Sequence, residues 1–235
     1  MRIRLAARAI GSFLLKVAIA FILLSVAGVA MLRWFEPPAS SFMVRQLVED
    51  WMEGDDEVFV YFDWVAWESI SPHVALAVVA AEDQRFPHHH GFDFAEIGNA
   101  LRDYSESGRL RGASTISQQV AKNLFLWPGR SMVRKALEGW FTLLLEGFLP
   151  KRRIMELYLN IAQFGPDIFG VGPASLRYFK KRPADVSLSE ASLLAAVLPN
   201  PQRYKVNDPS AYVRARARWI REQTRNLGSD YLQWL

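Results

Sequence analysis

Apolar residues first gather in one uninterrupted run near the start of the chain. Between Gly11 and Leu32 the only charged residue is Lys16, and about 20 apolar residues are enough to cross a bilayer as a helix. The basic residues before and early in the run predict a cytoplasmic N-terminus. A cleaved signal peptide is the alternative, although the run is long for one and no Ala-x-Ala-like cleavage site follows it. The pattern favours a cytoplasmic stub over 1–10 and an uncleaved transmembrane anchor over 11–33.

After the anchor the pattern changes twice. Residues 34–57 are predicted to form an acidic linker, and residues 58–67 are the only convincing strand-like run. From residue 71 onward the spacing of apolar residues is helical almost throughout. Helix starts are predicted from capping residues at Ser71 with Pro72, Asp93 with Glu96, Ser114, Ser131, Pro150, and Asp208 with Pro209. The sequence therefore predicts a mainly α domain over 58–235, with at most a small sheet element.

Composition and charge narrow the range of functions. The 235 residues include no cysteine, which excludes a disulfide framework and a thiolate metal site. The net charge of +4 is unevenly distributed, because residues 1–33 carry +5, residues 34–70 carry −8 and the remainder carries +7. A basic folded domain suits an anionic ligand or an anionic membrane face. No Gly-rich nucleotide-binding loop is present, and no nucleic-acid partner is expected.

Glu82 is the polar residue whose neighbours point most directly to chemistry. In the predicted helix it shares a face with Val78, Val79 and Phe86. Burial among apolar side chains raises the pKa of a carboxyl group, which makes it a usable proton acceptor or donor near neutral pH. The alternative is a structural ion pair between Glu82 and an arginine. Asp83 lies about 100° away around the helix, so the two carboxylates do not form a facing dyad.

Two other polar groupings are less specific. The histidines at 88–90 lack the spacing of paired metal ligands, so a structural or substrate-side role is favoured over a metal site. Further along, Gln118 and Lys122 share one helix face, while Gln119 and Asn123 share another. Rows of amide and ammonium groups can bind a sugar or a phosphate, and a solvated helix face is the alternative.

Two charged patterns have an ordinary explanation as well as a functional one. Arg134 and Lys135 lie one helical turn before Glu138, a spacing that usually gives modest helix support. Near the C-terminus, one helix face carries four arginines. Such a face is usually exposed to solvent, and the more specific alternative is contact with anionic lipid headgroups. These arginines are Arg214, Arg218, Arg221 and Arg225.

Taken together, these segments resemble glycosyltransferase family 51, the peptidoglycan glycosyltransferases, in order and register from about residue 60 to residue 205. The matching positions of the first three motifs are Glu82, Asp83, Phe86, His89 and Gly91, then Gly112, Ser114, Thr115, Gln118, Gln119, Lys122 and Asn123, then Arg134, Lys135 and Glu138. The fourth and fifth motifs match at Glu156, Tyr158, Leu159, Asn160, Gly165, Gly170 and Ala174, and over Val186 to Pro201.

The resemblance implies a lysozyme-like, mainly α fold with a large lobe and a membrane-facing jaw on either side of a substrate groove. It implies polymerisation of lipid II into β-1,4-linked glycan strands, with inversion at C1 and release of undecaprenyl pyrophosphate. Glu82 would be the general base, and Glu138, the second catalytic residue, would orient the neighbouring cations or the substrate. The substrate-binding residues implied are Asp83, Phe86, His89, Ser114, Gln118, Gln119, Lys122, Asn123, Arg130, Arg134 and Lys135.

The resemblance requires no cofactor and points to no metal cluster, but it leaves room for an assisting divalent cation, Mg²⁺ or Mn²⁺. Expected partners are lipid II, the growing glycan chain, the membrane and other cell-wall synthesis or division proteins. The expected location is the bacterial inner (cytoplasmic) membrane, crossed once, with the catalytic domain on the periplasmic or outer face. Because the SxxK, SDN and KTG motifs of a transpeptidase are absent, a monofunctional enzyme is expected. A lysozyme-like lytic glycosidase and a non-catalytic membrane-anchored scaffold are the alternative functions.

Overall fold

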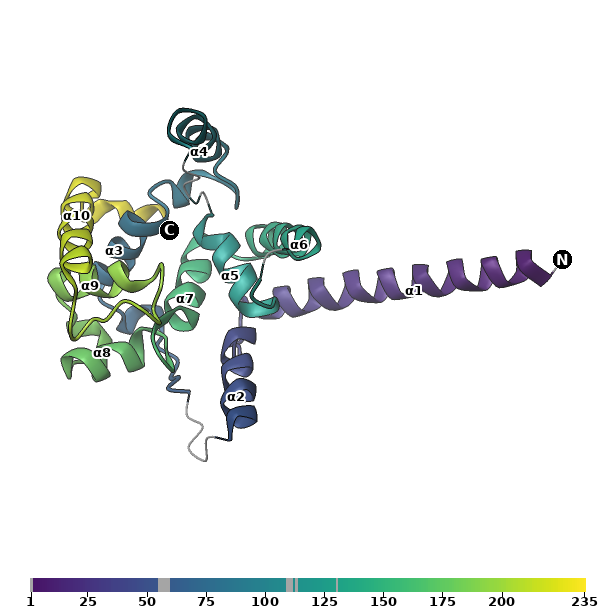
Figure 1. Ribbon diagram of the computed structural model, residues 1–235, viewed down its shortest axis with the longest axis horizontal. Coiled ribbons are helices and arrows are strands. Elements are labelled where there is room, and N and C mark those ends of the chain that lie inside the picture. The colour runs from purple at the N-terminus through teal and green to yellow at the C-terminus, as the bar shows by residue number, and fades with distance from the viewer. Residues whose placement is uncertain (1, 55–59, 109–111, 113, 130) are drawn as a thin grey trace.

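The computed structural model describes residues 2–54, 60–108, 112, 114–129 and 131–235. A long N-terminal helix, α1 (Arg2–Met31), stands out from a body of shorter helices (Figure 1). Its segment Ile10–Met31 is long and apolar enough to cross a membrane. The second half of α1 contacts the body, where the Trp140 indole donates a 3.1 Å hydrogen bond to Ser25 Oγ. The predicted anchor is thus a helix that is docked on the domain at one end.

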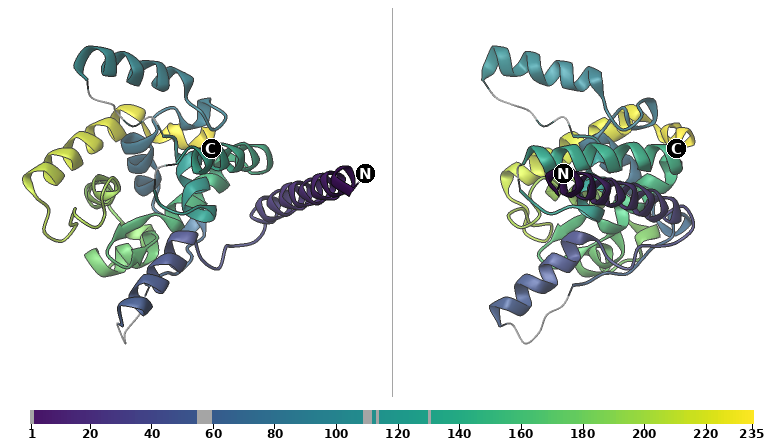
Figure 2. Two further views of the ribbon diagram at one scale, coloured as in Figure 1. Left: turned by 45° about the vertical axis from the view of Figure 1, so that its right-hand side comes forward. Right: turned by 90° about the vertical axis from the view of Figure 1, so that its right-hand side faces the viewer.

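The described residues of the body form α-helices, short 3-10 turns and a two-stranded hairpin, and Figure 2 shows the helices from two further sides. The α-helices are α2 (Ser41–Glu53), α3 (Pro72–Glu82), α4 (Phe94–Ser107), α5 (Ile116–Phe125), α6 (Met132–Phe148), α7 (Lys151–Ile161), α8 (Val171–Phe179), α9 (Leu188–Val197) and α10 (Ala211–Leu227). The 3-10 turns are η1 (Trp67–Ser69), η2 (Phe86–His88), η3 (Pro183–Asp185) and η4 (Ser229–Trp234), and the antiparallel strands are β1 (Gln163–Gly165) and β2 (Ile168–Phe169). The predicted mainly α fold is confirmed.

Helix α3 belongs to the first of two groups of helices, together with α9 and α10. Every residue from Val74 to Ala80 is buried, as expected for a helix that is apolar on all sides. It packs against α9 and α10, while α5 packs against α6 and α7 in a second group. Glu82, the last residue of α3, contacts Gln119 of α5 and so lies between the two groups of helices.

The helix starts show how caps set the boundaries. Ser131 and Pro150 precede α6 and α7 as predicted, and the Asp93 carboxylate accepts from the first turn of α4. Two predicted starts are wrong by one or two residues. Helix α5 is capped by Thr115 rather than Ser114, because Thr115 and Gln118 form a reciprocal capping box. Helix α10 is capped by Ser210, whose hydroxyl accepts from Val213, rather than by the preceding Asp-Pro pair.

The strand predicted over residues 58–67 is wrong for its described part. From residue 60 onward this segment forms only one isolated bridge, between Tyr61 and Ile168. Its backbone is paired by a side chain instead: the Asn160 amide accepts from Val65 N at 2.8 Å and donates to Val65 O at 2.9 Å. At Val65 a side-chain amide thus takes the place of a neighbouring strand. The hairpin of the structure, β1–β2, follows Asn160 in the sequence.

The predicted linker over residues 34–57 contains a helix. Ser40 caps α2, Gly54 ends it in a left-handed conformation, and Met43 is buried against the body. The remaining apolar face, Val44, Leu47, Val48, Trp51 and Met52, is exposed. The acidic composition of this segment concealed an amphipathic helix, because its charged residues occupy the other faces.

Candidate active site

Glu82 lies at the end of α3 with its carboxylate held between two other helices. Its side chain is 14% exposed, and Oε2 accepts a 2.9 Å hydrogen bond from Gln119 Nε2 on α5. Oε1 faces Arg216 of α10, whose Nη2 is 3.7 Å away. Burial raises the pKa of Glu82, whereas the Gln119 hydrogen bond and the charges of Arg216 and Lys122 act to lower it. The carboxylate is therefore a buried group with a raised pKa that remains partly open.

Gln119 is itself held by Tyr158, a buried residue of α7. The Tyr158 hydroxyl donates to Gln119 Oε1 at 3.2 Å, which leaves the Gln119 amide nitrogen to donate to Glu82. Burial raises the pKa of Tyr158 well above its usual value, so the phenol stays protonated and remains a donor. A chain of two hydrogen bonds thus fixes the orientation of the carboxylate.

Asp83 and His89 connect the end of α3 to the start of α5. Gly91 N donates to His89 Nδ1 at 3.2 Å, so His89 Nε2 carries the ring proton and donates to the Asp83 carboxylate at 3.0 Å. Asp83 Oδ2 also accepts from Ile116 N, the first residue of α5, at 3.0 Å. Asp83, His89 and the fully buried Phe86 lie in the interior. In this structure they position the site, and their expected contacts with substrate stay predictions.

The described residues contain one grouping with the composition of a metal site. Ligand-type atoms of Asp83, His89 and Asp93 lie within 4.8 Å of one another. These atoms are already used: Asp83 bonds His89 and α5, while Asp93 Oδ1 accepts from the start of α4 and pairs with Arg85 at 3.2 Å. The grouping is therefore a hydrogen-bond junction, and its donor atoms do not fit a resident cation.

A second charged cluster lies on α5 and α6. The buried Glu138 carboxylate accepts from Arg134 Nη1 at 2.8 Å and also pairs with Lys135. Burial lowers the pKa of nearby Lys122, and the Glu138 charge is the largest influence that raises it. Two cations thus pair with this carboxylate and a third, Lys122, interacts with its charge, which leaves an excess of positive charge suited to a phosphate group.

The remaining sequence-predicted residues fall into three classes. Gln118 is buried, and its side-chain oxygen accepts a 3.0 Å hydrogen bond from Thr115 N, so it caps α5. Ser114 is exposed and Asn123 is half-buried. Arg130 lies outside the described residues, and its expected role stays a prediction.

Comparison with known proteins identifies the family. The family model described as Transglycosylase matches residues 57–225. A biosynthetic peptidoglycan transglycosylase of Xylella fastidiosa (strain 9a5c) is 52% identical over 220 residues, which cover 93% of this chain and 90% of that protein. A protein of the same name from Cronobacter sakazakii is 53% identical over 205 residues, covering 87% of this chain and 85% of that protein. The corresponding protein of Shigella boydii is 49% identical over 219 residues, with 93% and 90% covered.

The chain belongs to the transglycosylase family. The resemblance inferred from the motifs is thereby confirmed, and so is the lysozyme-like class of fold. In this transglycosylase the matched region includes α10, which carries Arg216. The motifs do not point to Arg216, because the regular row of basic residues on this helix lies on another face. The proximity of Arg216 to Glu82 is a tertiary contact for which the local sequence holds no signal.

The transglycosylase has a second buried ion pair that the sequence did not reveal. Lys151 at the start of α7 donates to Glu146 Oε1 on α6 at 2.7 Å, and Ser117 of α5 bonds the same oxygen. The Lys151 ammonium lies 4.5 Å from the centre of the Phe86 ring, and burial lowers the pKa of Lys151. This pair ties three helices together directly behind the site.

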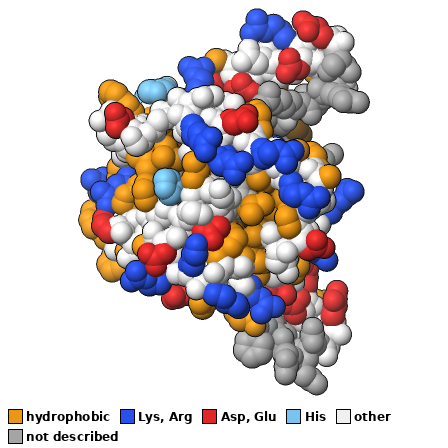
Figure 3. All heavy atoms as spheres, turned by 90° about the vertical axis from the view of Figure 1, so that its left-hand side faces the viewer, with side chains coloured by type: hydrophobic (Ala, Val, Ile, Leu, Met, Phe, Trp, Pro, Cys, Tyr) orange, Lys and Arg blue, Asp and Glu red, His pale blue; other side chains and the backbone are white. Residues whose placement is uncertain are grey.

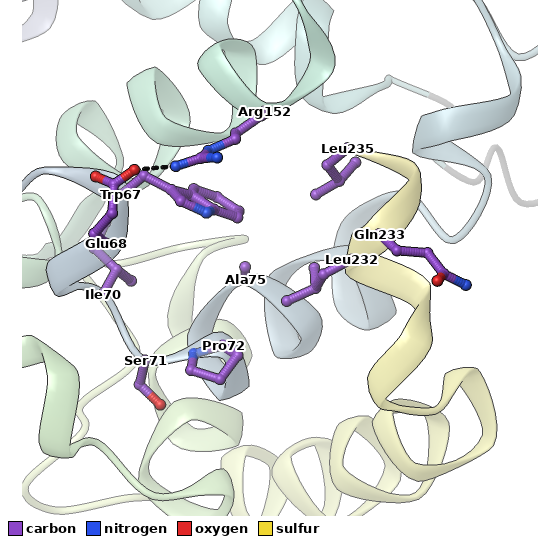
Figure 4. Close-up of a pocket in the computed structure, with 10 residues that line it drawn as sticks. All are labelled: Trp67, Glu68, Ile70, Ser71, Pro72, Ala75, Arg152, Leu232, Gln233 and Leu235. Atoms are coloured by element: carbon purple, nitrogen blue, oxygen red, sulfur yellow. Dashed lines mark hydrogen bonds and ion pairs between the residues drawn. The ribbon is translucent and has the colours of Figure 1, made fainter.

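A separate pocket lies elsewhere in the transglycosylase. A pocket of about 640 Å³ is bounded by Trp67, Arg152 and Leu232, and it reaches Ala75 near the start of α3 (Figure 4). Arg152 stacks over the Trp67 ring and pairs with Glu68 at its rim. None of the motif residues assigned to the site lines this pocket, so it is not the candidate active site.

Proposed function

We propose that the protein is a peptidoglycan glycosyltransferase of cell-wall synthesis, which polymerises lipid II into β-1,4-linked glycan and releases undecaprenyl pyrophosphate. Family membership and the names of the relatives support this proposal. The structural observation that carries it is one partly open buried carboxylate, Glu82, next to a separate cluster of cations around Glu138. Transfer from a pyrophosphate-linked donor needs both a proton acceptor and cations for the leaving group.

Glu82 serves as the general base in this reaction. Oε2 is engaged by Gln119, whereas Oε1 is 3.7 Å from its nearest charged partner and so is free to accept a proton. The proton comes from the 4-hydroxyl group of the acceptor GlcNAc, whose oxygen attacks C1 of the donor MurNAc. The bond between C1 and the pyrophosphate oxygen breaks, and the configuration at C1 inverts. A raised pKa brings this base closer to the working pH.

The cations stabilise the pyrophosphate as it leaves. Lys122 and the Arg134–Lys135 pair supply positive charge where negative charge develops in the transition state. Glu138 orients the pair, because it accepts from both side chains. Exposed Ser114 and half-buried Asn123 are the remaining predicted groups that can reach a sugar or phosphate.

Helix α1 supports a membrane location for the reaction. An uncleaved anchor with a cytoplasmic N-terminus keeps the catalytic domain on the outer face, where it meets a substrate that is itself a membrane lipid. Helix α10 lies on the opposite side of the body from α1 (Figure 1), and lysine and arginine side chains are spread over the face of the body that Figure 3 shows. Arg214, Arg218 and Arg225 are exposed, and Arg221 is half-buried. That placement favours a solvated face for Arg214, Arg218, Arg221 and Arg225 over contact with the anchored membrane.

The test is a polymerisation assay with labelled lipid II and purified full-length protein. Wild type should lengthen glycan products on a gel, Glu82→Gln should not, and Glu222→Gln, which neutralises an exposed glutamate of α10, should behave as wild type. Full activity in Glu82→Gln would refute the base assignment. Shortening of preformed glycan would instead identify a lytic glycosidase, and absence of turnover by wild type across detergents and divalent cations would favour a scaffold.

Assistance by a divalent cation, Mg²⁺ or Mn²⁺, stays a prediction. The ligand-type atoms of Asp83, His89 and Asp93 are engaged in hydrogen bonds, so these residues are not the site proposed for it. A polymerisation rate that falls with EDTA and is restored by Mg²⁺ or Mn²⁺ would support the prediction, and a rate that EDTA leaves unchanged would refute it.

A further inference from the structure

Arg216 approaches Glu82 from a helix that contributes none of the predicted site residues. Its Nη2 lies 3.7 Å from Glu82 Oε1 and donates a 3.5 Å hydrogen bond to the backbone oxygen of Ala81. The side chain is 23% exposed, so the guanidinium lies at the edge of the site and not in bulk water. Both contacts are to the last turn of α3.

The faces of α10 explain this placement. Its buried stripe, Val213, Ala217, Ile220 and Thr224, docks the helix against α3 and α9. Arg216 lies about 100° from the neighbouring stripe residue Ala217, which puts it at the border of the interface with α3. Arg218 is displaced by the same angle in the other direction and is exposed. Arg216 and Arg218 thus carry the same charge on one helix, and of these two only Arg216 faces the carboxylate.

The polar contacts of Arg216 are fewer and longer than expected for an arginine that only stabilises the fold. Its Nε is buried and has no hydrogen-bond partner among the described residues, and an unmet buried donor costs free energy. The distance to Glu82 is also too long for a hydrogen bond. A closer, bidentate pair would have occupied the oxygen that must accept a proton. At 3.7 Å the charge acts on the carboxylate while Oε1 stays open.

We propose that Arg216 is a positioning residue for the base, which draws the Glu82 carboxylate toward α10 and favours its ionised form without blocking Oε1. This inference rests on the proposed role of Glu82. Gln119 holds one carboxylate oxygen from α5, and Arg216 acts on the other from α10. The Glu82 carboxylate is thus held between α5 and α10.

Several other groups influence the charge of Glu82. Burial opposes ionisation, and so does the negative charge of Asp83, whereas Lys122 on α5 favours it. Tyr158 of α7 is neutral and acts only through Gln119. Since an opposite charge within about 4–6 Å typically lowers a carboxyl pKa by about 1–3 units, loss of Arg216 should raise the pKa of Glu82 measurably.

The experiment is the pH dependence of polymerisation at low lipid II concentration, with full-length protein in detergent. In Arg216→Gln the acid limb of the profile should move to higher pH by about one unit. At a pH below the wild-type limb the rate should then fall about tenfold and should recover as the pH rises. Arg216→Lys keeps the charge and should show a smaller shift. The matched control, Arg218→Gln, removes the same charge from the exposed face and should keep the wild-type profile.

The outcomes separate this inference from the proposed function. If Glu82→Gln is inactive but Arg216→Gln keeps the wild-type limb, the role of Arg216 is refuted and the base assignment stands. The role is also refuted if Arg218→Gln shifts the limb as much as Arg216→Gln, because the effect would then be general charge. If Glu82→Gln is active, the base assignment itself fails. Should Arg216→Gln not fold, as judged by circular dichroism, the comparison of Arg216→Lys with wild type decides.

Discussion

Replacing Gly91 with alanine should damage the site through its supporting structure. Gly91 has a φ of +85°, a region that side-chain-bearing residues rarely adopt. Its N–H donates to His89, and its carbonyl accepts from the Thr115 hydroxyl at 2.7 Å. A Cβ at this position would lie 2.6 Å from Thr142 Cγ2 and 3.1 Å from Glu146 Cγ. The substitution therefore strains the backbone and also collides with α6.

The magnitude follows from these two effects. A left-handed conformation costs a residue with a side chain about 1–2 kcal/mol. An additional methyl group forced into a packed interior costs about 1–3 kcal/mol. Because Thr142 is itself fully buried, it has little room to move away. Gly91→Ala should therefore lower the free energy of unfolding by about 2–5 kcal/mol.

Urea unfolding, followed by tryptophan fluorescence, tests this value with two controls. Gly108→Ala places an alanine at φ +67° with no described atom within 4 Å of its Cβ, so it should show only the backbone cost. In Gly91→Ala with Thr142→Ser, the colliding methyl is gone while the hydroxyl that bonds Glu138 O remains. The double variant should regain about 1–3 kcal/mol and much of the polymerising activity. Equal losses in Gly91→Ala and Gly108→Ala would refute the steric reasoning.

Two further substitutions test the charged and hydrogen-bonded parts of the site. Glu138→Gln removes the charge that raises the pKa of Lys122, so the alkaline limb of the polymerisation profile should move to lower pH; an unmoved limb would show that Lys122 is not the titrating group. Tyr158→Phe removes the hydrogen bond to Gln119, so urea unfolding should show a loss of about 0.5–1.5 kcal/mol and the lipid II assay a several-fold slower rate. An unchanged rate would mean that Gln119 needs no support from Tyr158.

Local chemistry explains why several helix ends were predictable. Ser131 caps α6, which runs to Phe148 as expected, and Gly228 follows α10. At α5 two adjacent hydroxyl residues compete for the cap, and Thr115 takes it because a glutamine stands three positions later. That pattern is visible in the sequence and could have settled the choice. Boundaries of this kind depend on residues within one turn, so sequence spacing contains the information.

The geometry of the site depends on contacts that spacing does not encode. Helix periodicity placed Glu82 on an apolar face, but its partners Gln119 and Arg216 lie on helices distant in sequence. The same limit explains the misplaced strand, since the Asn160 side chain that pairs with Val65 comes from α7. Periodicity identifies the face of a helix that is buried. The packing of helices decides which residue that face meets.

Helix α5 links the two charge requirements of the reaction. Gln119 contacts the proposed base, Glu82, and Lys122, three residues later, interacts with the charge of Glu138. Along the helix axis this separation is about 4.5 Å, so a single rigid element fixes the spacing between the partner of the proposed proton acceptor and one of the proposed leaving-group cations. In an inverting displacement the attacking and leaving oxygens lie on opposite sides of one carbon, and that spacing must hold while both bonds change. Asp83 anchors α5 at its first backbone N–H, so this buried carboxylate helps to hold Gln119 and Lys122 in place.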